Sequence, residues 1–163
     1  MTATPATPDP AGLRARIFRA ENAAGDGRRN AMGSTASGPG QITDGTWRSY
    51  APRLGLTEAQ RNDRAAQERV FDACMADAQK AVGRALADGE AYAAWLLGIA
   101  GLRRFLAAGR DADALETYRA VAGRRVADQA FRQNPGLLEP GMTVGEVLDA
   151  LERRIAPRPR AGR

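Results

Sequence analysis

Apolar residues recur at three- and four-residue spacing near the start of the chain, which is the pattern of an amphipathic helix. One face of this helix carries Leu13, Ile17, Phe18 and Glu21. Asp9 is placed to cap the helix, and Pro10 fits its first position, where a missing N–H costs nothing. Gly25 and Gly27 are expected to end it. The pattern therefore places an acid, Glu21, on an apolar face.

The same periodicity predicts five further helices, over residues 57–87, 91–108, 111–122, 126–133 and 143–155. Thr57 with Gln60, and Thr143 with Glu146, have the spacing of a capping box. The helix over 91–108 is apolar nearly all round, which predicts a central, buried position. Gly98 and Gly101 are the points at which this helix can bend.

Residues 28–46 are rich in glycine and have little hydrophobic periodicity, so they predict a loop with room for a short hairpin. A short helix with Trp47 and Tyr50 follows, capped by Asp44 or Thr46. The fold class predicted is mainly α, with one domain over 10–156. A flexible lead over 1–9 and a basic, disordered tail over 157–163 are expected to flank it.

Composition removes several kinds of site. The chain of 163 residues has no histidine and one cysteine, Cys74, so a histidine-based triad and an internal disulfide are excluded and a zinc site lacks its usual ligands. We expect no metal and no cofactor. Cys74 lies in a helical pattern and is predicted to be a small buried hydrophobe. No apolar run approaches the roughly 18 residues of a membrane span.

Glu21 is the residue with the clearest chemical potential. It lies on the apolar face and in the last turn of its helix, and both burial and the negative end of the helix dipole raise the pKa of a carboxyl group. A polar, glycine-rich loop over residues 34–47 follows. A protonated acid beside such a loop is suited to acid-catalysed cleavage of a sugar chain.

These residues resemble the lytic transglycosylases of the lysozyme-like superfamily. In that family a catalytic glutamate at a helix end is followed about twenty residues later by a segment like the one that runs here from Ser37 to Trp47, Ser-Gly-Pro-Gly-Gln-Ile-Thr-Asp-Gly-Thr-Trp. The run over 91–106 and the segment from Asn134 to Val147 resemble pieces of small members associated with phages or secretion machines. The resemblance covers roughly residues 13–155 and implies a lysozyme-like α+β fold with a minimal β or loop segment after the first helix.

Three positions depart from the family pattern. Asn22 follows the glutamate where serine is common, and Pro39-Gly40 replaces a bulky pair. Trp95 begins Trp-Leu-Leu-Gly where many members have Tyr-Asn-Ala-Gly or a histidine. An aromatic ring is kept at this position, but the polar contact to the acid is not visible in the sequence.

The resemblance implies a mechanism in which Glu21 protonates the glycosidic oxygen between N-acetylmuramic acid and N-acetylglucosamine. Glu21 then acts as base while the muramic C6 hydroxyl closes a 1,6-anhydro ring. The expected substrate-binding residues are Ser37, Gln41, Thr43, Trp47, Trp95 and Tyr118. For Ser37, Gln41 and Thr43, hydrogen bonding to the backbone of their own loop is an equally good interpretation. Core packing is the more common role of aromatics such as Trp47 and Trp95.

Other interpretations remain open at this stage. A hydrolysing muramidase would use a second acid, for which Asp26 and Asp44 are the candidates. A noncatalytic peptidoglycan-binding or assembly module would keep the same groove. A nucleic-acid binder ranks lowest, because the arginines that give the net charge of +5 are spread over all the helices.

The N-terminal residues lack the basic start and apolar core of a secretory signal. We therefore expect synthesis in the cytoplasm and action on the cell wall in the periplasm, with delivery by a phage particle, a gene-transfer particle or a secretion apparatus. The expected partner is the peptidoglycan glycan strand, and the expected state is a monomer without nucleic acid.

Overall fold

The computed structural model describes residues 9–22 and 35–157 of the chain. Within these ranges the protein is mainly helical, as the sequence predicts, and strand pairing is limited to two isolated bridges. There are two short 3-10 turns in these ranges, η1 (Pro52–Leu54) and η2 (Glu58–Gln60). The helices are α1 (Pro10–Glu21), α2 (Asp44–Tyr50), α3 (Arg64–Val82), α4 (Asp88–Ala108), α5 (Ala114–Ala122), α6 (Arg124–Gln133) and α7 (Val144–Ile155).

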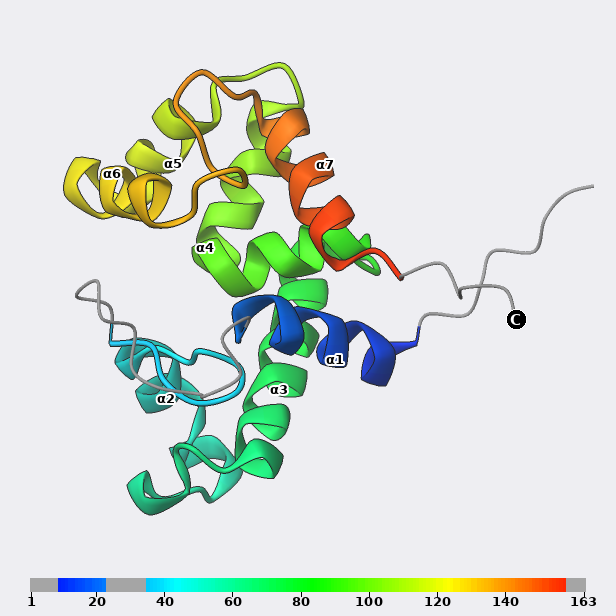
Figure 1. Cartoon of the computed structure of the whole chain (residues 1–163), viewed down its shortest axis with the longest axis vertical. Helices are drawn as coiled ribbons and strands as arrows, with labels where there is room; N and C mark the ends of the chain where they lie inside the picture. Colours follow the sequence, from blue (N-terminus) through cyan, green and yellow to red (C-terminus); the bar gives the residue numbers. More distant parts are fainter. Residues whose placement is uncertain (1–8, 23–34, 158–163) are drawn as a thin grey trace, which may run out of the picture.

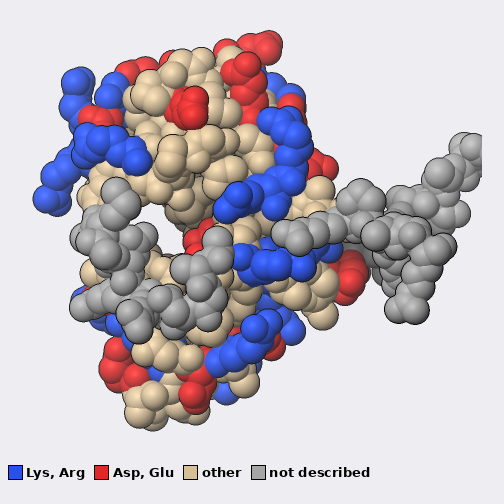
Figure 2. All heavy atoms as spheres, in the orientation of Figure 1, with Lys and Arg blue, Asp and Glu red and all other residues tan. Residues whose placement is uncertain are grey.

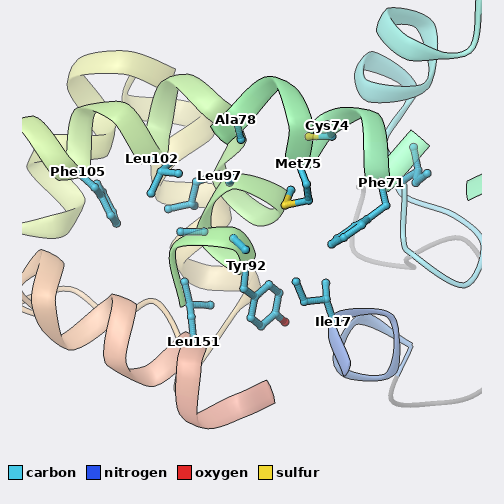
Figure 3. Packing of buried hydrophobic residues seen from close by; sticks show 14 of the residues in the cluster. Ile17, Phe71, Cys74, Met75, Ala78, Tyr92, Leu97, Leu102, Phe105 and Leu151 are labelled. Carbon is cyan, nitrogen blue, oxygen red and sulfur yellow. The ribbon is translucent and has the colours of Figure 1, made fainter. Parts of the chain in front are cut away.

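Helix α4 is central and packs against α3, α5 and α7, while α1 contacts both α3 and α7 (Figure 1). The expectation of a central helix over 91–108 is confirmed. Figure 3 shows Leu102 and Phe105 of α4 in one continuous core with Phe71 of α3. Cys74 of α3 belongs to the same core and is 6% exposed, as predicted.

Local capping explains where α1 and α7 begin. The Asp9 carboxylate accepts a hydrogen bond from the Gly12 N–H at 2.9 Å, and Pro10 is the first residue of α1. Thr143 and Glu146 form the predicted capping box, in which the Glu146 side chain accepts from the Thr143 N–H at 2.8 Å. Short-range sequence signals are sufficient at both places, because the partners are three residues apart.

The predicted cap of α2 and both predicted ends of α3 are wrong. Helix α2 is capped by Thr43, whose hydroxyl accepts from the Thr46 N–H at 3.3 Å, and neither Asp44 nor Thr46 is the cap. The Thr57–Gln60 capping box is present, but it caps only the single turn η2. Helix α3 begins at Arg64 and ends at Val82, inside the predicted range of 57–87. The Arg61 side chain, between η2 and α3, donates 3.0 Å to the Thr35 carbonyl and 3.3 Å to the Ile42 carbonyl. The helical pattern is therefore interrupted between η2 and α3 at the point where Arg61 binds the loop that precedes α2.

Gly98 interrupts α4, as the sequence predicts for a glycine at this position. Its φ of 79° and ψ of 164° are essentially restricted to glycine, and they divide the helix into two segments. Gly101 does not bend the helix. A Cβ atom there would lie 3.0 Å from the Tyr118 ring, so a larger residue would crowd the packing of α4 on α5.

The predicted lead and tail fall almost wholly on residues 1–8 and 158–163, which lie outside the described residues, as do Gly25 and Gly27. Among the described helices, none is long and apolar enough to cross a membrane.

Candidate active site

Glu21, the last residue of α1, lines a cleft with a volume of about 750 Å³. Gln41 and Thr43 line it from the loop before α2, and Tyr92, Trp95 and Leu96 line it from α4. Most of the remaining wall comes from the end of α6, the residues that follow it, and α7. Figure 2 shows this face of the molecule hollowed between the part that contains α5–α7 and the part that contains α2 and α3.

Glu21 has the electrostatics of a proton donor. Burial raises the pKa of its carboxyl group to about 7, while a hydrogen bond with the Tyr92 hydroxyl and the charge of Arg154 act in the opposite direction. The burial follows from the apolar face of α1, on which Ile17 is 0% and Phe18 2% exposed. At neutral pH a substantial fraction of Glu21 is therefore protonated, which a general acid needs.

Tyr92 is a functional candidate that the sequence interpretation missed, because it counted only as part of the apolar pattern of its helix. It is 2% exposed, and Figure 3 shows its hydroxyl directed toward α1. Burial and the neighbouring Glu21 carboxyl raise the pKa of the Tyr92 hydroxyl, so it stays protonated and donates to Glu21. The polar contact that Trp95 cannot supply thus comes from one helical turn earlier on α4. The spacing of three residues between Tyr92 and Trp95 was the available signal.

Trp95 lines the cleft and also binds the loop that forms part of its wall. The indole N–H donates to the Gly40 carbonyl at 3.0 Å. The ring centroid lies 4.9 Å from that of Phe71 and 6.2 Å from that of Phe18. The packing role expected for this residue is present, together with a direct tie between α4 and the loop.

Gln67 of α3 is the second residue that the sequence interpretation missed. It is fully buried, and its side-chain oxygen accepts from the Gly40 N–H at 2.7 Å. Its side-chain nitrogen donates to the Ser37 carbonyl at 2.9 Å and to the Arg61 carbonyl at 2.8 Å. One side chain therefore fixes the backbone of the loop that faces Glu21.

The two glycines of the loop are required by this close approach. A Cβ atom on Gly38, which has a φ of 76°, would lie 2.0 Å from the Gln67 side-chain nitrogen. A Cβ atom on Gly40 would lie 2.8 Å from the Phe18 ring. The Ser-Gly-Pro-Gly segment thus has glycine where Gln67 and Phe18 leave no space for a side chain.

The three predicted loop residues have different places. Ser37 forms a backbone bridge with Ile42 (N–O distances of 3.1 and 2.9 Å) and is absent from the cleft lining. Gln41, whose φ of 50° is left-handed, lines the cleft while its side-chain nitrogen donates to the Gly38 carbonyl at 2.9 Å. Thr43 lines the cleft and caps α2. Loop capping and a place in the cleft therefore coexist in Gln41 and Thr43.

Two predicted aromatic contacts with substrate are not available in this arrangement. Trp47 is 2% exposed in the core, and Tyr118 is 7% exposed against Gly101. Neither lines the cleft. An aromatic residue just after a helix start looks the same in sequence whether it faces a groove or the core, and the packing of α2 decides for the core.

Glu21 is the only carboxylate among the described residues that line the cleft. Asp44, one of the two candidates for a second acid, is instead 2.5 Å from the Arg61 guanidinium and does not line it. Asp26 lies outside the described residues. No group of three or more potential metal-ligating side chains occurs in the part of the chain that the structure describes.

The burial of Glu21 predicts a stability effect that is independent of catalysis. Its pKa is 4.5 as a free side chain and about 7 in the fold, so between these values the unfolded chain releases a proton that the folded chain keeps. The free energy of unfolding therefore falls as the pH rises through this window, by about 3 kcal/mol. Relative to the wild type, Glu21→Gln should gain about this much between roughly pH 4 and pH 8 in denaturant unfolding.

Glu152→Gln is the matched control, since Glu152 is exposed on α7 and does not line the cleft. A gain in Glu21→Gln no larger than that in Glu152→Gln would contradict the burial of the Glu21 carboxyl.

In comparisons with known proteins, no protein-family model and no curated protein sequence matches this chain.

Proposed function

We propose that this protein is a peptidoglycan lytic transglycosylase with a lysozyme-like fold. It cleaves the β-1,4 bond between N-acetylmuramic acid and N-acetylglucosamine and leaves a 1,6-anhydro end. The observation that carries the proposal is Glu21, a carboxyl group with a pKa of about 7 at a helix end in a polar cleft. The mainly helical architecture is compatible with this fold.

In the proposed reaction, protonated Glu21 donates its proton to the glycosidic oxygen as the bond from that oxygen to C1 of the muramic sugar breaks. The Glu21 carboxylate then takes the proton from the C6 hydroxyl of the same sugar while that oxygen bonds to C1. Proton and bonds balance without water, and Glu21 ends protonated as it began. The Tyr92 hydroxyl, which donates to the carboxylate, orients Glu21 in both steps.

Neutral polar groups on both walls fit a sugar chain. Gln41 and Thr43 lie on the loop wall, and Gln133 and Asn134 lie on the wall formed by the end of α6 and the residue after it. Amide and hydroxyl groups can exchange hydrogen bonds with sugar hydroxyl and N-acetyl groups. Gln67 and Trp95 position the loop wall and do not themselves act on the sugar.

Glu21 is the single carboxylate among the described residues that line the cleft, and this favours transglycosylation over hydrolysis. A hydrolase that uses the two-carboxylate mechanism needs a second acid, about 5–9.5 Å from the first depending on stereochemistry. No second acid lines the cleft in the described ranges 9–22 and 35–157. In the transglycosylase scheme the substrate supplies the nucleophile, so one acid is sufficient.

The test is incubation of the purified protein with isolated sacculi, followed by separation and mass analysis of the released muropeptides. The expected products have 1,6-anhydromuramic ends. Reducing ends would indicate a muramidase on the same scaffold. Absence of release, with binding retained, would identify a noncatalytic peptidoglycan-binding module.

The pH profile tests the role of Tyr92. Because a general acid must be protonated, activity should fall as the pH rises through about 7, the pKa of Glu21. The Tyr92 hydrogen bond lowers this pKa, so Tyr92→Phe should move the alkaline limb of kcat/KM to higher pH. Turnover at each pH should be measured as release of anhydro ends.

Tyr118→Phe is the control, because this tyrosine is also buried but does not line the cleft. An alkaline limb that moves equally in the two variants would argue against a specific Tyr92–Glu21 contact.

A further inference from the structure

The cleft contains two positive charges that the proposed reaction does not use. Arg153 and Arg154, in the last turn of α7, both line the cleft with Glu21. Figure 2 shows arginine side chains beside the hollow, over α7 and α1. They are the only cationic side chains among its described lining residues.

These two arginines differ from the arginines of the molecule that form ion pairs. Arg16 lies 2.5 Å from Asp88, Arg84 lies 2.7 Å from Glu90, and Arg110 lies 2.7 Å from Asp149. By contrast, neither the Arg153 nor the Arg154 side chain makes an ion pair or hydrogen bond within the part of the chain described here. Two adjacent guanidinium groups that form no ion pair with a described carboxylate, with Glu21 close enough to Arg154 to respond to its charge, can therefore serve an anion that enters the cleft.

We propose that Arg153 and Arg154 form a subsite for a carboxylate of the glycan substrate, so that the protein selects an acidic sugar polymer over a neutral one. This inference rests on the proposed function for the position of the scissile bond. Two sources of a carboxylate exist in peptidoglycan: the stem peptide and the lactyl group of a muramic residue from which the peptide has been removed. The guanidinium groups recognise the chemistry that both share.

Occupation of this subsite is coupled to the acid. The Arg154 charge lowers the pKa of Glu21, and the Tyr92 hydroxyl from α4 does the same. A substrate carboxylate paired with Arg154 offsets its charge, and Glu21 is then protonated over a wider pH range. An acidic glycan thus promotes the protonated state that its own cleavage requires.

The ordinary role of basic residues in a last helical turn is to interact with the helix dipole. The two roles separate by substitution. R153K/R154K keeps the charges and the dipole interaction but loses the planar, two-pronged geometry of guanidinium. R153Q/R154Q loses the positive charges as well as the guanidinium geometry.

Binding is measured first, in a Glu21→Gln background in which cleavage is expected to be strongly reduced, by co-sedimentation with sacculi free of teichoic acid. The R153Q/R154Q pair should weaken binding by about tenfold, the loss expected for hydrogen bonds to a charged group. R153K/R154K should recover part of it. The matched control is R103Q/R104Q, an adjacent, exposed arginine pair on α4 that does not line the cleft.

Three ligands identify the carboxylate. Arginine dependence with intact sacculi but not with amidase-stripped glycan indicates the stem peptide, and the reverse indicates the lactyl group. A chito-oligosaccharide, which has no carboxylate, should bind weakly and equally in all variants. Equal binding of R153Q/R154Q and R103Q/R104Q to both acidic ligands would overturn the subsite, as would an equal loss with the chito-oligosaccharide. Because binding uses the inactive background, absence of cleavage by the wild type would reject the proposed function without affecting this result.

Discussion

Glu21→Gln is expected to reduce release of 1,6-anhydro-muropeptides from sacculi by about a thousandfold, within the range for loss of a general acid. The amide keeps the size of the side chain but cannot donate the proton to the glycosidic oxygen or take one from the C6 hydroxyl. Burial, which raises the pKa of Glu21 to about 7, makes this one group suitable for both steps. Single-turnover rates on purified glycan strands are the measurement.

Glu152→Gln provides the comparison, because it makes the same chemical change on an exposed residue of α7 outside the cleft. It should cleave at the wild-type rate. Wild-type release by Glu21→Gln would remove Glu21 from the reaction, whereas binding to sacculi that survives in Glu21→Gln would confirm that the cleft remains folded.

Gln67→Leu is expected to lower the free energy of unfolding by about 3 kcal/mol, because it removes three hydrogen bonds and leaves their backbone partners unsatisfied. The partners are the Gly40 N–H, at 2.7 Å, and the carbonyls of Ser37 and Arg61, at 2.9 and 2.8 Å. For a chain of this length the melting temperature should fall by about 6–12 °C. Calorimetry or denaturant unfolding gives the value.

The same change should lower kcat/KM below the melting transition, since the loop wall opposite Glu21 loses its anchor on α3. Gln79→Leu, an exposed position on the same helix, is the control and should unfold like the wild type. If Gln67→Leu melts with Gln79→Leu, the loop is held by other contacts, such as the bond from the Trp95 indole to the Gly40 carbonyl.

The predictions that hold are those whose physical basis is local. The cap at Asp9 and the box at Thr143 each join groups three residues apart, so sequence spacing is sufficient to predict them. The predictions that fail depend on distant contacts. The capping box at Thr57 has the same local signal, but the helix that it predicts is interrupted before Arg64. In this interval the Arg61 side chain donates a hydrogen bond to the Thr35 carbonyl.

The candidate site divides in the same way. Glu21 could be found from the sequence because it shares the helical period of Ile17 and Phe18, and that period fixes the face on which it lies. The sequence also indicated Gln41 and Thr43, which line the cleft. The sequence could not distinguish these two cleft residues from Trp47, which follows the same polar loop but is buried in the core.

The sequence by itself determined a mainly helical chain with a carboxyl group at the end of an apolar helix face, since both follow from spacing along one segment. The tertiary structure alone decided what surrounds that carboxyl. Tyr92, Arg154 and the loop tied to Gln67 come from three different helices and meet only when α4 and α7 pack against α1 and α3. The pKa of Glu21 depends on burial and on charges nearby in space, and spacing along the chain specifies neither.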